Sequence, residues 1–489
     1  MEARSFHTSL TNAVLVVVAV ASFALPKVGQ TADHSIGAET PTINCAAMNI
    51  QPGDTVTLAG GTRGNLAIRS CKGTASNKIT FRNDPNSDTR TVIQAQGDKG
   101  FRGVDCLDCE HVVIDGLGKW QGAPTGVCGI ERSTRTEGRT QCGIRVIRTT
   151  GNPTTLFAFR GTSKNITVRG VEIDGSEQNS GGAGIGMYIN DRNYDNVSGG
   201  EWRENFLVEN VYFHDTFHEG IYAGPNYGHR DSAGDLNLRN IEFAYNLVED
   251  TGWGGLQIKS AVQGSNSIHH NHFYRAGWIA AQNNDTGHGI CTQMDGTTGA
   301  IHDNYFEDCG GFAIGYRMQY LPASFGDLDC KIFNNVIVGS GDILTAQGIG
   351  VWRPSSSQAS PKCQIVNNTI VDTNGSGIGV SSSINGVTIR DNIVVGSTKS
   401  DITAPSGNSV SENLTGPVIN ARFINPAARD FRLRTDSPAV DSGSSVSFVT
   451  EDYLDVPRPI AGQTDKGAFE LMADQSSKRP KPPVVVQIQ

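Results

Sequence analysis

The chain has 489 residues and a formal net charge of −9, and its lysines and arginines form no basic block. This charge distribution argues against nucleic acid as a partner. Glycine is unusually frequent, at 58 residues, or about 12% of the chain against about 7% in average proteins. Helix-forming runs are rare while Ile, Val, Thr and Asn are common, which favours β-structure with many turns.

The N-terminus contains one apolar run, AVLVVVAVASFAL at residues 13–25, which follows Arg4 and His7. This run is too short to span a membrane but suits the core of a secretory signal peptide, with SFA at 22–24 as the cleavage site. We therefore predict a signal peptide over residues 1–24, a secreted or cell-surface protein, and no membrane span after cleavage. An uncleaved anchor and a segment without any targeting role remain as alternatives.

All ten cysteines follow the predicted cleavage site, and six of them precede residue 143. An even number in an exported chain predicts disulfides, although the sequence does not give their pairing. Cys106 and Cys109 have a spacing that also occurs in zinc and redox sites, but no second pair stands at zinc-finger spacing. We expect disulfide staples in an irregular N-terminal region.

From residue 164 onward the chain repeats a unit of two short strand patterns, such as AIHDNYFE (300–307) and GLQIKS (255–260). The first pattern contains an asparagine that recurs at gaps of 25, 33, 31, 33 and 24 residues, a spacing typical of repeat proteins. The recurring asparagines are Asn246, Asn271, Asn304, Asn335, Asn368 and Asn392. We predict that the units stack as coils of a parallel β-helix, with the asparagines forming a hydrogen-bonded ladder at one bend.

This organisation resembles the right-handed parallel β-helix proteins of the pectate lyase, alginate lyase and chondroitinase B-like superfamily. Residues 51–84 look like the first coils of such enzymes, and FINPAARDFRLRTDSPAVDSG, from residue 423, looks like the C-terminal segment of bacterial choice-of-anchor proteins. The resemblance implies an all-β solenoid over 33–415, a C-terminal capping segment over 416–472 and a disordered tail over 473–489. It implies secreted, carbohydrate-active proteins but fixes no reaction, because one solenoid hosts many activities.

The glycine-led strands can be aligned by matching Leu256 to an isoleucine in each neighbouring coil: Ile221, Ile290, Ile314, Ile349 and Ile378. Outward positions then form two files on one face. One file holds Tyr222, Gln257 and Cys291, and the other holds Tyr188, Lys259, Gln293, Arg317 and Trp352. Just before the strands, Glu219 and His288 are predicted to share one position. Aromatic rings beside two cations, an acid and a histidine indicate a groove for a sugar chain.

These groups suit cleavage of a uronic-acid polymer by β-elimination, which needs a cation to neutralise the carboxylate and a base to remove the adjacent proton. We predict Lys259 or His288 as the base and Arg317 as the charge neutraliser, with Glu219 as a further catalytic candidate. The predicted substrate-binding residues are Tyr188, Tyr222, Gln257, Gln293 and Trp352. The Lys–Arg pair is similar to that of the chondroitinase B and alginate lyase family, which also uses calcium. Calcium is therefore possible in the Asp/Asn-rich turns at 283–285 or 191–196.

Three alternatives remain open at this stage. A β-helix glycoside hydrolase would need two carboxylates facing each other across the scissile bond. The candidate acids are Asp215, Glu219, Glu249, Asp250, Asp285 and Asp295. A non-catalytic glycan-binding or surface protein would use the groove only to hold a polymer, and a purely structural solenoid would not use it at all. The sequence specifies neither the polymer nor the oligomeric state.

Overall fold

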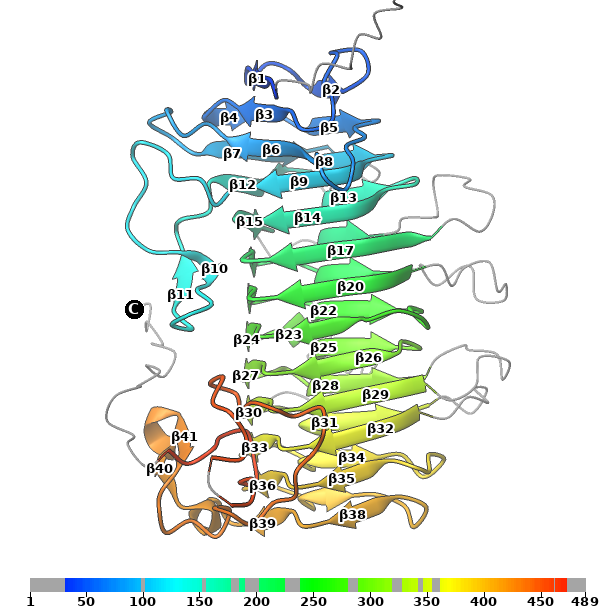
Figure 1. Ribbon diagram of the computed structural model, residues 1–489, viewed down its shortest axis with the longest axis vertical. Coiled ribbons are helices and arrows are strands. Elements are labelled where there is room, and N and C mark those ends of the chain that lie inside the picture. The colour runs from blue at the N-terminus through cyan, green and yellow to red at the C-terminus, as the bar shows by residue number, and fades with distance from the viewer. Residues whose placement is uncertain are drawn as a thin grey trace, which may run out of the picture.

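The computed structural model describes residues 31–97, 102–151, 155–176, 184–189, 202–224, 238–279, 289–318, 328–341, 346–353, 361–460 and 462–472. In these residues the chain forms a right-handed parallel β-helix, which confirms the predicted fold class (Figure 1). Each coil passes through sheet A, then sheet C, then sheet B. The predicted signal peptide and tail lie outside the described residues. No helix in the described part of the chain is long and apolar enough to cross a membrane.

Three long sheets build the solenoid. Sheet A contains β1 (Asp33–Ile36), β3 (Thr55–Leu58), β6 (Ile79–Asn83), β9 (Glu110–Asp115), β14 (Lys164–Arg169), β17 (Arg203–Glu209), β20 (Leu238–Ala244), β23 (Ser267–His269), β26 (Gly299–His302), β29 (Leu328–Phe333), β32 (Pro361–Val366), β35 (Thr388–Arg390) and β38 (Ser409–Ser411). Sheet B contains β2 (Thr42–Asn44), β5 (Leu66–Arg69), β8 (Arg102–Leu107), β13 (Thr155–Arg160), β16 (Ile185–Ile189), β19 (Glu219–Ala223), β22 (Gly254–Lys259), β25 (Ile290–Asp295), β28 (Phe312–Arg317), β31 (Ile349–Trp352), β34 (Ile378–Val380) and β37 (Ile402–Thr403). Sheet C contains β4 (Gly61–Arg63), β7 (Thr91–Gln96), β12 (Ile144–Thr150), β15 (Val171–Asp174), β18 (Tyr212–His214), β21 (Leu247–Glu249), β24 (His272–Tyr274), β27 (Tyr305–Glu307), β30 (Val336–Val338), β33 (Thr369–Val371), β36 (Ile393–Val395) and β39 (Leu414–Gly416).

The solenoid interior is filled by apolar side chains that repeat from coil to coil. Ile166, Phe206 and Ile241 are successive register partners in sheet A, and all three are fully buried. Phe273 and Phe306 stack in sheet C with ring centroids 4.7 Å apart. β-Branched and aromatic residues therefore face the same residue types above and below, which stabilises parallel pairing through side-chain contact.

The asparagine ladder is present at the turn from sheet A to sheet C, as predicted. The side-chain nitrogen of Asn246 donates to Oδ1 of Asn271 at 2.9 Å, and the chain of amides continues through the other four predicted asparagines. Asn413 adds a further rung at 2.9 Å that the sequence did not reveal. The residue before each rung is left-handed, as at Asp303 (φ 54°), a conformation that Asp and Asn tolerate better than most residues.

The outer face of sheet C carries buried tyrosine and aliphatic side chains, and two segments far apart in the sequence pack on them (Figure 1). One is the hairpin of β10 (Cys128–Ile130) and β11 (Glu137–Arg139). The other is the chain after residue 416, which contains the short 3₁₀ helices η3 (Val418–Ala421) and η4 (Pro426–Ala428) and the hairpin of β40 (Phe423–Asn425) and β41 (Asp430–Leu433). A sugar polymer therefore has no access to sheet C where these segments lie.

All ten cysteines are paired, which confirms the predicted disulfides. The bonds are Cys45–Cys71, Cys106–Cys109, Cys128–Cys142, Cys291–Cys309 and Cys330–Cys363. The close spacing of Cys106 and Cys109 thus reflects a short-range disulfide rather than zinc ligands. Cys330 and Cys363 are register partners in sheet A, so their bond joins neighbouring coils.

Candidate functional site

Three rows of outward residues run along sheet B. The first row contains Glu219, Gly254, Ile290 and Phe312. The middle row contains Tyr188, Tyr222, Gln257, Gln293, Gly315, Gly350 and Gly379. The last row contains Lys259, Asp295, Arg317 and Trp352. Inward and outward side chains do not alternate strictly in these strands. Between an outward residue of the first row and the next outward residue, in the middle row, two consecutive residues point inward, as Cys291 and Thr292 do.

The register differs from the sequence prediction at β25. Ile290 pairs with Gly254, and it is Thr292 that pairs with Leu256. Thr292 occupies the inward position because its hydroxyl donates to the carbonyl of Leu256 at 3.0 Å, while Cys291 points inward to its disulfide with Cys309. The sequence predicted an apolar residue at this inward position. The structure instead has a threonine, whose hydroxyl is hydrogen-bonded, next to a buried disulfide.

This shift of two residues places Gln293 beside Gln257 in the middle row instead of beside Lys259. A separate difference occurs at β16, where Met187 pairs with Ile221 and Tyr188 therefore lies beside Tyr222 in the middle row. The position of Glu219 corresponds to Ile290 two coils on, so the predicted sharing of one position by Glu219 and His288 is wrong. His288 itself lies outside the described residues, as do the calcium candidates at 283–285 and 191–196.

The last row brings three charged side chains onto consecutive coils. Lys259, Asp295 and Arg317 are register partners, and each is at most 7% exposed. Nε of Arg317 donates to Oδ2 of Asp295 at 3.0 Å. Nζ of Lys259 lies 4.9 Å from the centroid of the Tyr222 ring. Lys259 and Arg317 are thus about 10 Å apart, two strand spacings, on the same face as the sequence predicted.

The middle row begins with two tyrosines and continues with two glutamines. The rings of Tyr188 and Tyr222 lie 5.3 Å apart. Gln257 and Gln293 are 5% and 4% exposed, and the amide nitrogen of each has no hydrogen-bond partner among the described residues. Buried amide groups in proteins are normally hydrogen-bonded. Two adjacent amide donors without partners therefore indicate a binding site for a ligand that carries hydrogen-bond acceptors.

Beside these glutamines lies a small cavity of about 10 Å³, lined by Glu219, Trp253, Gln257, Ile290 and Gln293 among others. That volume holds roughly one water molecule. The ring of Trp253 stacks on His218 at 4.2 Å, and Nδ1 of His218 is 4.0 Å from a carboxylate oxygen of Glu219. Glu219 therefore reaches the glutamine pair from the first row.

The C-terminal part of this face carries an aromatic platform, formed by Phe312 and Trp352, that the sequence predicted only in part. Phe312 and Trp352 are half-buried and stack with centroids 4.8 Å apart. Their rings lie over Gly315 and Gly350, where an added Cβ would come within 2.9 Å of Trp352 in both cases. Gly315 and Gly350 thus make room for these two rings.

The candidate carboxylates of a glycosidase are divided between sheet B and the sheet C side among the described residues. Asp250 pairs with Arg275 at 2.7 Å, Glu249 pairs with Arg139, and Asp215 bonds His214 at 2.8 Å, all on the sheet C side. Glu219 and Asp295 both lie on sheet B, five strand positions apart, which is about 16 Å along the strand direction. Glycosidase pairs are separated by about 5 to 9.5 Å. Asp285 lies outside the described residues.

A charged cluster on sheet C was missed by sequence reasoning. Glu172, Asp174 and His214 lie within 4.8 Å of one another, and Arg90 and Arg145 pair with the two carboxylates. Burial opposes protonation of His214, but its hydrogen bonds to Asp215 and Glu172 and the charge of Asp174 outweigh burial and raise its pKa to about 9. The positive and negative charges of this cluster therefore compensate each other, and we assign the cluster a structural role.

Comparison with known proteins finds structural likenesses at low sequence identity. No protein-family model and no curated protein matches the chain. A polysaccharide lyase of family PL6 from Pseudopedobacter saltans is similar at 13% identity and a TM-score of 0.44, over 84% of this chain and 98% of that one. Pectate lyase Pel9A is similar at 13% identity and 0.42, over 91% and 98%.

A GH136 lacto-N-biosidase from Eubacterium ramulus is also similar, at 15% identity and a TM-score of 0.42, over 79% of this chain and 68% of that one. At these identities the likeness concerns the solenoid alone. The resemblance of the C-terminal segment to choice-of-anchor proteins stays a prediction. The structural neighbours of this chain are thus β-helix polysaccharide lyases and a β-helix glycoside hydrolase.

Proposed function

We propose that this protein is a secreted or cell-surface polysaccharide lyase that cleaves a uronic-acid polymer by β-elimination on the outer face of sheet B. The observation that carries the proposal is the last row, in which Lys259, Asp295 and Arg317 lie on consecutive coils beside the unpartnered amides of the middle row. The cysteine pairing and the apolar N-terminal run support export.

In this proposal the ε-amino group of Lys259 removes the proton from the carbon next to the uronate carboxylate. Arg317 binds that carboxylate, which stabilises the negative charge that develops as the proton leaves. Electrons of the broken C–H bond form a carbon–carbon double bond, the bond to the glycosidic oxygen breaks, and that oxygen takes up a proton. Tyr222, whose ring faces Lys259 at 4.9 Å, is the proposed proton donor.

The neighbouring residues are proposed to hold the polymer. Gln257 and Gln293 donate hydrogen bonds to sugar hydroxyl or carboxylate oxygens, with Glu219 accepting at the adjoining cavity. Tyr188 closes one end of the groove and Trp352 stacks on a sugar ring at the other end. Because the rows run along the solenoid axis, the polymer crosses successive strands of sheet B about 4.8 Å apart.

The test is a panel of uronate polymers, including alginate, pectate and chondroitin, followed by the ultraviolet absorbance of the new conjugated double bond. Lys259→Ala and Arg317→Ala should each lower turnover by about 100-fold or more, the usual contribution of a positioned acid–base group. Lys399→Ala and Arg434→Ala, which remove exposed cations from other parts of the molecule, are the matched controls.

The same panel separates the alternatives. Reducing ends without ultraviolet absorbance would indicate a hydrolase and would sink the elimination. Retention on an immobilised polymer without turnover would indicate a glycan-binding protein. Full activity in Lys259→Ala or Arg317→Ala would show that the reaction occurs elsewhere.

A further inference from the structure

A second cluster of ligand-type side chains lies far from sheet B, at the turn from sheet A to sheet C. His270 and Asp303 occupy the left-handed positions of two successive turns (φ 58° and 54°), and His302 is the last residue of β26. One ligand atom from each of these three residues can be chosen so that all lie within 4.8 Å of one another. The stacking of coils thus brings together residues 33 positions apart in the chain.

One oxygen of Asp303 is left without a partner. Oδ2 of Asp303 accepts a hydrogen bond from Nδ1 of His302 at 2.6 Å. Asp303 is only 8% exposed, and its Oδ1 is buried. This oxygen has no hydrogen-bond partner in the part of the chain that the structure describes. A buried carboxylate oxygen without a partner points to a missing cation.

The two histidines are suited to coordinate a metal. Imidazole nitrogens are among the commonest ligands of divalent transition metals. Nε2 of His270 lies 3.5 Å from Oδ1 of Asp455, and its Nδ1 lies 2.8 Å from Nδ1 of His269. One of these two nitrogens must release its contact to bind the ion, and the contact of the other then orients the ring.

The arginines near this cluster make their hydrogen bonds to other groups. Arg135 donates to Asp455 at 3.0 Å and to the carbonyl of Tyr453 at 3.2 Å. Arg135 and Arg458 attract the charge of Asp303 from nearby. Among the described residues neither arginine forms an ion pair with Asp303, unlike the Glu172–Asp174–His214 cluster, in which Arg90 and Arg145 pair with the carboxylates.

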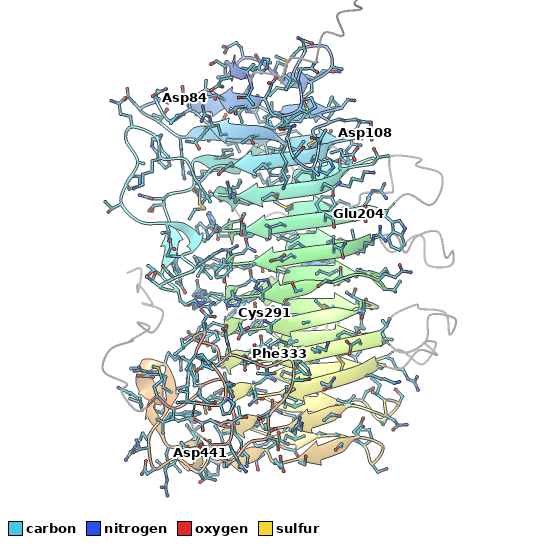
Figure 2. All side chains as sticks on the ribbon, viewed as in Figure 1. Asp84, Asp108, Glu204, Cys291, Phe333 and Asp441 are labelled. Atoms are coloured by element: carbon cyan, nitrogen blue, oxygen red, sulfur yellow. A yellow bond between two sulfur atoms is a disulfide. The ribbon has the colours of Figure 1, made fainter. Side chains whose placement is uncertain are left out.

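We propose that His270, His302 and Asp303 form a binding site for a divalent transition-metal ion of the zinc type. Two imidazoles and one carboxylate are a usual ligand set for zinc, with a water molecule completing the tetrahedron. Asp455 belongs to the C-terminal segment, so the ion would hold this segment against the solenoid through His270. Phe333, labelled in Figure 2 beside that segment, stacks on His302 at 4.6 Å and shields the site.

The test uses the full chain, stripped with a chelator, dialysed and titrated with zinc chloride by calorimetry. We expect one zinc ion per chain and a melting temperature that rises with zinc concentration. Cobalt(II) in place of zinc should give the intense visible absorption of a tetrahedral site. Asp303→Asn and His302→Phe should weaken zinc binding by about 100-fold or more, since even residues behind the ligands cost about 10- to 100-fold.

His111→Asn is the matched control, because His111 lies on the distant strand β9 with φ 51°, which asparagine tolerates. It should bind zinc as the wild type does. His302→Phe continues the ring stack with Phe333 and should keep the fold, which circular dichroism checks. Absence of stoichiometric zinc binding, a cobalt spectrum of octahedral type in the wild-type protein, or unchanged binding in folded Asp303→Asn would each overturn the proposal.

Discussion

Asp295 and Arg317 are register partners on β25 and β28, and they form a buried ion pair in which Arg317 donates to Asp295 at 3.0 Å. Their side chains are 4% and 9% exposed. The charge of Arg317 is therefore held in place from one side, which orients the guanidinium toward the groove. A substrate carboxylate would meet a preorganised cation instead of a mobile one.

Asp295→Asn should destabilise the protein by about 3 kcal/mol, because it removes a charged partner from a buried ion pair. The shift of the urea midpoint at constant slope measures this loss. Asp436→Asn removes the partner of Arg434 at a half-exposed pair and should cost less than about 1 kcal/mol. Equal effects of the two substitutions would show that the Asp295 pair is not buried from water.

Asn304→Leu should lower the free energy of unfolding by about 3 kcal/mol or more, since several buried groups lose a partner at about 1 to 3 kcal/mol each. Asn304 donates to the carbonyls of Ile268 and His302 and to Oδ1 of Asn335, and it accepts from Asn271. Asn413→Leu, at the partly exposed end of the ladder, should cost clearly less. Similar losses at both positions in urea unfolding would contradict a ladder that depends on burial.

His214 should make the protein more stable in mild acid than in alkali. Its folded pKa of about 9 exceeds the unfolded value, so its contribution is fully present below about pH 6.5 and is lost as the pH rises toward 9. The expected loss is about 3 kcal/mol. His214→Asn should remove this dependence, seen as a difference between the two stability curves that narrows from pH 6 to pH 9. Parallel curves would contradict the raised pKa.

Gly350→Ala should disturb the aromatic platform without unfolding the solenoid. The new Cβ would lie 2.7 Å from Cδ1 of Phe312 and 2.9 Å from Cζ3 of Trp352, so both rings must move. If the platform stacks on sugar, oligosaccharide affinity should fall by about 3- to 10-fold, measured by tryptophan fluorescence. Gly64→Ala, where an added Cβ meets nothing within 4 Å, should leave affinity unchanged. Unaltered binding by Gly350→Ala would remove the platform from the site.

The solenoid could be predicted because its determinants repeat locally. The spacing of the asparagines and the apolar core of each strand are visible in the chain, and the ladder from Asn246 to Asn392 forms as expected. The cover on sheet C could not be predicted. It depends on contacts such as Arg135 with Asp455, 320 residues apart, and nothing in either local sequence indicates the other.

The candidate site was predictable only in outline. Lys259 and Arg317 lie in one row as expected, yet the residue between them is Asp295 instead of Gln293. The error arose because apolarity was used to choose the inward residue, and Ile290 points outward while Thr292 satisfies its hydroxyl inside. In β25 two consecutive residues point inward, so the alternation of inward and outward side chains is interrupted. A search for a period of two residues cannot detect this interruption in so short a strand.

The ladder has a consequence for how this molecule can change in length. Between coils, each amide bonds the coil before and the coil after through the same donor and acceptor atoms at every step. Excising or duplicating one complete coil would therefore rejoin identical partners and leave the rest of the stack undisturbed. The number of coils, and with it the length of the sheet B face, is a quantity that whole-coil deletion or duplication can adjust without redesigning the interior.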